Sequence, residues 1–139
     1  MSNTKIYIHF VDGTDVFIPV NAEIITDNTY KVLPNNEFDY EDDAILFEYG
    51  VNDLVNGELS NFRNGEIGLV ASQLIKSGSI QNDYKRMLFC ILHKEPEPSF
   101  ILKSFDKSVI QLAQTNKLKY PKLIDWFNEH RLAIQSFVQ

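Results

Sequence analysis

The spacing of hydrophobic residues differs between the first and second parts of the chain. In the first part apolar and polar side chains alternate, as in residues 5–11, where Ile6, Ile8 and Phe10 share one face. A period of two is typical of a β-strand. From Ile80 onward, apolar positions recur every three or four residues, which is typical of helices with one buried face. The pattern therefore predicts a β half followed by an α half.

Turn-forming pairs separate the predicted strands of the first half. Asp12-Gly13 follows the first strand and Asp27-Asn28 lies between two later apolar runs, which predicts two hairpins. Further strands are predicted at residues 44–49, 54–55 and 67–76, with a polar loop over 56–65. We expect a small, bent, mainly antiparallel sheet or an SH3-like barrel over about residues 4–76, because closure hides strand edges.

About three helices are predicted after the sheet. They cover residues 80–93, residues 98–116 and the chain from residue 121 toward its end. Ser79 is suited to cap the first helix, and Pro98 and Pro121 are tolerated in the first turn of the other two. The fold class is therefore α+β. We predict a single domain over residues 1–139, with a mainly β part at 1–76 and a mainly α part at 77–139.

The net charge of −6 is unevenly distributed. Residues 1–66 hold thirteen Asp and Glu against three Lys and Arg, whereas residues 67–139 hold six against ten. An acidic field attracts cations or basic proteins and repels nucleic acid. The basic residues of the second half are interpreted as a solvated face that complements the acidic half within the molecule or across a homodimer. Nucleic-acid binding would have to use Lys103, Lys107, Lys117, Lys119 and Lys122, and it is not the favoured function.

The acidic stretch EFDYEDD at residues 37–43 is the principal candidate site. If it is extended, Phe38 and Tyr40 lie on one face and the acids lie on the other. Aromatic anchors surrounded by charge are typical of a protein interface, although either ring would also serve to pin the loop by tucking beneath it. The predicted partner-binding residues are Glu37, Phe38, Asp39, Tyr40, Glu41, Asp42, Asp43 and Glu48.

Carboxylates are also ligands for metal ions, and the acidic stretch is rich in them. A calcium loop that starts at Asp39 requires glycine at its sixth position and Glu at its twelfth, where the chain has Ala44 and Gly50. No hydrolase, nucleotide-binding or histidine metal motif is present. We therefore predict no catalytic residue and no cofactor, and favour a non-catalytic protein. The alternative is a metal-dependent enzyme whose carboxylate ligands come from Asp39, Glu41, Asp42 and Asp43.

The compartment is predicted from the first residues and from the cysteine content. The N-terminal apolar run is interrupted by His9 and ended by Asp12, so we expect neither a signal peptide nor a membrane span. A single cysteine, Cys90, permits no internal disulfide, which agrees with the cytoplasm. Trp126 is interpreted as a packing residue.

Several short motifs of the first half occur in a fixed order. They are Pro19-Val20-x-Ala22, Tyr30-Lys31-Val32-Leu33, Phe47-Glu48-Tyr49-Gly50 and Asp53-Leu54-Val55. This order resembles a pattern in small, largely uncharacterised bacterial proteins, where the last segment reads Phe-x-x-Gly-Asp-x-Val. Here two residues separate Gly50 from Asp53. The resemblance implies a bacterial protein and assigns no catalytic residue. With the charge pattern, it leads us to expect a cytoplasmic protein-binding module, of an immunity type, that uses its acidic surface against a basic partner.

Overall fold

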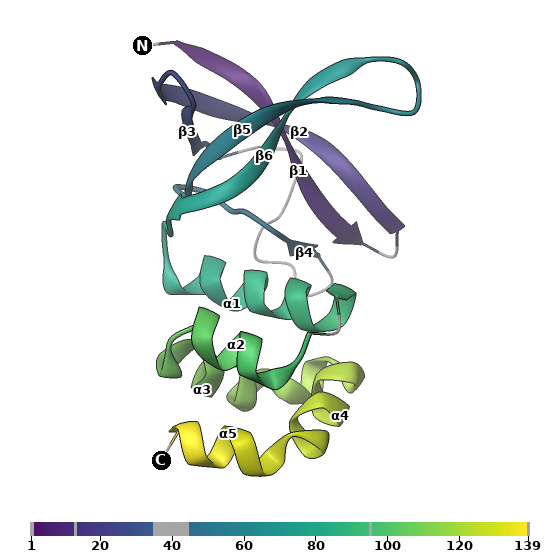
Figure 1. Cartoon of the computed structure of the whole chain (residues 1–139), viewed down its shortest axis with the longest axis vertical. Coiled ribbons are helices and arrows are strands. Elements are labelled where there is room, and N and C mark those ends of the chain that lie inside the picture. Colours follow the sequence, from purple (N-terminus) through teal and green to yellow (C-terminus); the bar gives the residue numbers. More distant parts are fainter. Residues whose placement is uncertain (1, 13, 35–44, 95, 139) are drawn as a thin grey trace. The chain divides into compact units, whose positions relative to one another are not determined.

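The computed structural model describes the whole chain except residues 1, 13, 35–44, 95 and 139. By internal contacts the chain divides into two compact units, Met1–Asn82 and Asp83–Gln139. The strands belong to the first unit, and helices make up most of the second (Figure 1). The predicted α+β class is confirmed.

The described part of the first unit contains a six-stranded mixed sheet. The strands are β1 (Asn3–Asp12), β2 (Thr14–Thr26), β3 (Thr29–Val32), β4 (Leu46–Phe47), β5 (Leu54–Asn61) and β6 (Ile67–Lys76). They are ordered β2-β3-β5-β6-β1-β4, and β2 also pairs with β1. The sheet therefore closes into a ring of hydrogen-bonded strands without forming a clear barrel (Figure 1). Tyr7 and Val70 join β1 to β6 in parallel, whereas the other strand pairs are antiparallel.

Three strands differ from the prediction. β2 is one long strand where two were expected; its first part pairs with β1 and its end with β3. β4 covers only Leu46–Phe47 of the strand predicted over 44–49, and residue 44 lies outside the described part of the chain. Most of the predicted polar loop over 56–65 is β5, which pairs with β6 as far as Asn61 and Ile67. Cross-strand pairing outweighs the weak β propensity of Asn, Gly and Glu in this segment.

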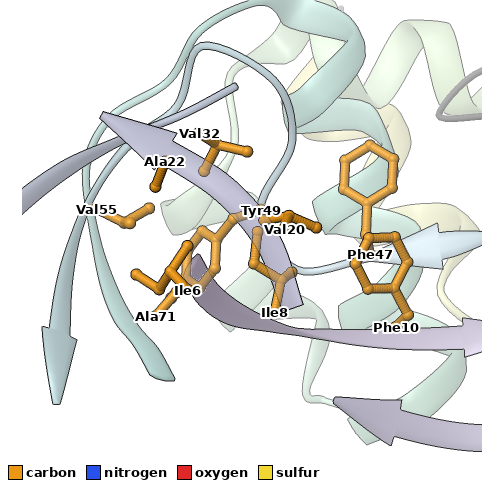
Figure 2. Close-up of a cluster of buried hydrophobic side chains, with 10 residues drawn as sticks. All are labelled: Ile6, Ile8, Phe10, Val20, Ala22, Val32, Phe47, Tyr49, Val55 and Ala71. Atoms are coloured by element: carbon orange, nitrogen blue, oxygen red, sulfur yellow. The ribbon is translucent and has the colours of Figure 1, made fainter. Parts of the chain in front are cut away.

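The core of the first unit confirms the period of two. Ile6, Ile8 and Phe10 of β1 are at most 1% exposed and lie on one face of the strand. Side chains from the other strands and from the β4–β5 turn complete the cluster (Figure 2). Its remaining members are Val20, Ala22, Val32, Phe47, Tyr49, Val55 and Ala71.

A buried carboxylate joins two turns of the first unit. Asp53 has no exposed surface, and its Oδ2 accepts a hydrogen bond from the Gly50 N–H at 2.8 Å. Its Oδ1 accepts from the Gly78 N–H at 2.6 Å and from Nδ2 of Asn82 at 3.0 Å. Asn82 also donates to the Val51 carbonyl at 2.8 Å. The turn before β5 is thus bonded to the segment after β6.

The helical segments are shorter and more numerous than predicted. They are α1 (Ile80–Phe89), the π-helical η1 (Cys90–Lys94), α2 (Pro98–Ser104), α3 (Lys107–Asn116), the 3-10 segment η2 (Lys117–Lys119), α4 (Pro121–Glu129) and α5 (Arg131–Val138). The hydroxyl of Ser79 accepts a hydrogen bond from the Asn82 N–H at 3.1 Å, so the predicted cap of α1 is confirmed. In the second unit α5 contacts α2, α3 and α4.

Two predicted helices are each divided in two. Phe105 and Asp106 adopt extended backbone angles between α2 and α3, and the Asp106 carbonyl accepts hydrogen bonds from the amides of Val109 and Ile110. Asp106 is thus the N-cap residue of α3, although its side chain makes no capping hydrogen bond. Between α4 and α5, His130 has φ −114° and ψ 26°, which is neither helical nor extended, and its amide donates to the Trp126 carbonyl.

Candidate functional site

A groove rich in aromatic side chains lies on the first unit, and we call it the aromatic groove. It has a volume of about 900 Å³ and is formed by β1, β2, the end of β5, the β5–β6 turn and β6. Its lining residues are Tyr7, His9, Val16, Phe17, Ser60, Asn61, Phe62, Arg63, Asn64, Glu66 and Val70.

Four rings in the aromatic groove pack on one another. His9 and Phe17 are stacked, with ring centroids 4.7 Å apart and planes 16° from parallel. The centroid of Phe62 lies 4.8 Å from that of Tyr7 and 6.2 Å from that of Phe17. These separations fall in the range where aromatic pairs attract each other beyond simple burial. The rings therefore form one continuous aromatic surface.

The strand register explains how the rings of β1 and β2 meet. Because Ile6 and Ile8 point into the core, Tyr7 and His9 lie on the opposite face of β1. The antiparallel register places Phe17 directly across from His9, which brings the two rings into a cross-strand pair.

The β5–β6 turn supplies the remaining ring. The Phe62 amide donates a hydrogen bond to the Glu66 carbonyl at 2.8 Å, and the Gly65 amide donates to the Phe62 carbonyl at 3.0 Å. Gly65 has a φ of +85°, a conformation that glycine adopts without strain. This tight turn holds Phe62 at the position from which it contacts Tyr7.

Because Gly68 on β6 has no side chain, the rings of Phe62 and Tyr7 can lie close to its backbone. A Cβ atom at this position would lie 2.4 Å from Cε2 of Phe62 and 2.8 Å from Cε2 of Tyr7. Both distances are too short for carbon atoms that are not bonded, so a side chain at residue 68 would displace the rings. The shape of the aromatic groove thus depends on this glycine.

The aromatic groove exposes apolar surface to solvent. Phe17 is 45% exposed and Val16 is 37% exposed, although both are large hydrophobic residues. Arg63 and Glu66 add one charge of each sign. Exposed apolar surface bordered by polar groups is typical of an interaction site. The chemistry of this lining supports recognition of another molecule.

The residues predicted for partner binding are mostly outside the described part of the chain. This applies to Glu37, Phe38, Asp39, Tyr40, Glu41, Asp42 and Asp43, and thus to the predicted metal ligands among them. Glu48 is described: it follows β4, is half-buried, and its amide donates to the His9 carbonyl at 3.1 Å. It does not line the aromatic groove. Among the residues with described positions, no three His, Cys, Asp or Glu side chains form a group suited to a metal ion.

Sequence reasoning did not identify the aromatic groove. The available indication was the pair Tyr7 and His9, large side chains on the face of β1 opposite the core, together with Phe17 across the hairpin. Phe62 gave no such indication because it lies in a turn far along the chain, and only the closed sheet brings it to Tyr7.

Comparisons with known proteins give no relatives for this chain: no family model, no curated protein and no solved structure matches it. Within the described residues, no helix is long and apolar enough to span a membrane.

Proposed function

We propose that the protein is a non-catalytic binding module whose first unit takes a basic protein partner, with the aromatic groove as the anchoring contact. The observation that carries this proposal is the exposure of Phe17 within a continuous aromatic surface. Aromatic side chains are enriched at the centres of protein interfaces, where a few of them contribute most of the binding energy.

The charge of the first unit supports a basic partner. Residues 1–82 hold thirteen Asp and Glu against four Lys and Arg, a formal net charge of −9, whereas residues 83–139 hold six against nine, or +3. A field of this strength accelerates the encounter with a positively charged protein. The residues proposed to steer the partner remain Glu37, Asp39, Glu41, Asp42, Asp43 and Glu48, with Phe38 and Tyr40 as additional anchors.

A protein is a better candidate for the groove than a nucleic acid. Aromatic side chains also stack on bases, and single-stranded nucleic acid is commonly bound in this way. Such binding relies on cations that neutralise phosphates, and the affinity falls as they are removed. The aromatic groove offers one arginine, Arg63, on a unit whose formal charge is −9. Phosphate repulsion would therefore oppose any stacking.

The finer proposal is an immunity-type role in the bacterial cytoplasm, in which the acidic unit masks a basic and otherwise harmful protein. The bacterial setting follows the motif resemblance in the first half of the chain, and the single cysteine agrees with a reducing compartment. A homodimer, in which the +3 unit of one copy meets the −9 unit of another, is a further arrangement compatible with these charges.

A matched pair of variants tests the role of the aromatic groove. Phe17 and Ile25 lie on the same strand and are both 45% exposed, but only Phe17 lines the groove. The unmodified chain, Phe17→Ala and Ile25→Ala would each be used to capture proteins from a bacterial lysate at low salt. Captured proteins would be identified by mass spectrometry, purified and tested by surface plasmon resonance.

We expect at least one basic protein whose dissociation constant rises about 30-fold with Phe17→Ala, the effect of losing about 2 kcal/mol at a hot spot. Ile25→Ala should bind as the unmodified chain does, and the association rate should fall steeply with salt. Equal capture by the two variants, or capture of no basic protein, would overturn the proposal.

A further inference from the structure

The first half of β2 has a neighbouring strand on one side only. β1 covers one side of β2 as far as Glu23, whereas β3 covers the other side only from Ala22 onward. No described residue pairs with that other side over residues 15–19, which we call the β2 edge. Phe17 and Pro19 of the β2 edge are exposed. The backbone of this segment is therefore accessible to another chain (Figure 1).

The hydrogen-bond pattern determines which backbone groups of the β2 edge point outward. In an antiparallel pair, alternate residues bond to the partner strand, and the residues between them direct their N–H and C=O away from it. The His9 carbonyl accepts from the Glu48 amide at 3.1 Å, so it points away from β2. Phe17 lies directly across from His9 and shares its position in the alternation. The N–H and C=O of Phe17 therefore point away from β1, to the open side.

Two later residues of β2 agree with this alternation. Pro19 lies two positions after Phe17, and proline is tolerated in a strand where the missing N–H would face away from the ladder. The carbonyl of Asn21, two positions further, points outward and accepts from the Leu33 amide at 2.9 Å. The β2 edge thus directs the N–H and C=O of Phe17 and the C=O of Pro19 to the open side.

The aromatic groove lies next to these backbone groups. Val16 and Phe17 point to opposite faces of β2, yet both line the groove, so the groove extends to the backbone between them. A strand added here would place one of its residues directly opposite Phe17, and opposite residues share a face of the sheet. The side chain of that residue would lie against the ring of Phe17, which attracts an ammonium or guanidinium group.

Charge favours a basic segment over a second copy of the chain. Pairing of one β2 edge with that of another copy would bring together two units of formal charge −9. In the register centred on Phe17, it would also set Pro19, which lacks an N–H, opposite Asp15 of the other copy. A basic segment of another protein meets neither difficulty.

We propose that the β2 edge binds an extended basic segment of the partner protein as an added β-strand, with an arginine or lysine of that segment on the ring of Phe17. The N–H of Phe17 donates to the segment and its C=O accepts from the segment. Backbone bonds of this kind supply affinity, and the adjoining groove selects the side chain. This inference rests on the proposed function and adds the conformation in which the partner is bound.

Synthetic peptides distinguish strand addition from attraction by charge alone. The strand probe is a peptide of about nine residues, the length of a long strand, in which lysine alternates with threonine or valine around a central arginine. A helical probe of equal charge is built from alanine, lysine and arginine. Two N-methylated strand probes keep every side chain: one is methylated at the arginine and the two nearest lysines, the other at the two nearest valines. Binding to the full chain would be measured by fluorescence anisotropy and by amide NMR shifts.

We expect the strand probe to bind saturably, with the largest shift changes at the β2 edge. Methylation at the arginine and lysines removes the donors that face Phe17 and its neighbours, and should raise the dissociation constant about tenfold. Methylation at the valines, whose N–H groups face away, should leave the constant unchanged. Phe17→Ala should weaken binding, whereas Ile25→Ala, on the same strand outside the β2 edge, should not.

Absence of saturable binding of the strand probe would overturn this inference, as would equal effects of the two methylation patterns. A helical probe that binds as tightly as the strand probe, yet loses affinity with Phe17→Ala, would also overturn it while leaving the aromatic groove as the anchoring contact. The two proposals can therefore fail separately. Sedimentation of the chain alone should show no dimer that Phe17→Ala disrupts; such a dimer would assign the β2 edge to a second copy.

Discussion

Replacement of Asp53 by asparagine tests whether the buried carboxylate stabilises the first unit. Both oxygens of Asp53 accept hydrogen bonds, one from Gly50 and the other from Gly78 and Asn82. Asparagine keeps one acceptor oxygen and places an NH₂ group where the second oxygen was. At least one N–H donor would therefore face another donor and lose its partner.

The cost follows from the number and type of these bonds. A hydrogen bond to a charged group contributes about 1.5–3 kcal/mol, and a buried donor left without a partner costs about 1–3 kcal/mol. Removal of a fully buried charge returns part of the desolvation cost. We therefore expect Asp53→Asn to lower the free energy of unfolding of the first unit by about 3 kcal/mol. Domains are typically stable by about 5–15 kcal/mol, so the variant should still fold.

Hydrogen exchange followed by mass spectrometry shows which segments of the chain lose stability in Asp53→Asn. Peptides from β5 and β6 should exchange about 100-fold faster in Asp53→Asn, the equivalent of about 3 kcal/mol. Asp27→Asn is the matched control, because Asp27 is an exposed residue of the β2–β3 turn. That control should stay within about 0.5 kcal/mol of the unmodified chain. A loss in Asp53→Asn no larger than in the control would refute the reasoning.

Three further predictions concern the aromatic groove, the start of α1 and metal binding. Gly68→Ala should displace the rings of Phe62 and Tyr7 and lower stability by about 1–3 kcal/mol; unchanged aromatic NMR shifts of both rings would contradict this. Ser79→Ala removes the acceptor for the Asn82 amide and should cost about 1 kcal/mol, seen as faster exchange in α1 only. Titration with calcium, magnesium and manganese should leave the melting temperature unchanged, whereas a saturable rise would favour the metal-dependent enzyme.

Local patterns predicted those elements whose formation depends on near neighbours. The alternation of Ile6, Ile8 and Phe10 identified β1 because one face of that strand is buried. Ser79 identified the start of α1 because capping acts within one turn. By contrast, only the start of β5 was predicted, at residues 54–55, because its polar residues 56–61 form a strand only through pairing with β6. The break at Asp106 was missed because the apolar spacing continues across it.

The roles of individual side chains depended on distant residues and were harder to predict. Asp53 was counted in the acidic charge of the first half, yet it is fully buried and bonded to Gly78, twenty-five positions away. The sequence indicated the sign of the charge on the first half. It could not indicate the aromatic groove, which requires Phe62 to reach Tyr7 across the closed sheet. The residues predicted for partner binding at 37–43 remain a prediction.

The parallel pairing of Tyr7 with Val70 also has a consequence for synthesis of the protein. These residues are sixty-three positions apart, and their pairing joins the first strand to the last one of the ring. The β1–β2 hairpin can form soon after it leaves the ribosome, but the β6 edge of β1 must wait until residue 70 has emerged. Pairing at such separation is slow compared with hairpin formation. The aromatic groove, which needs β1, β2 and β6 together, is therefore absent from nascent chains that end before β6, so the partner site proposed there forms only after β6 has been translated.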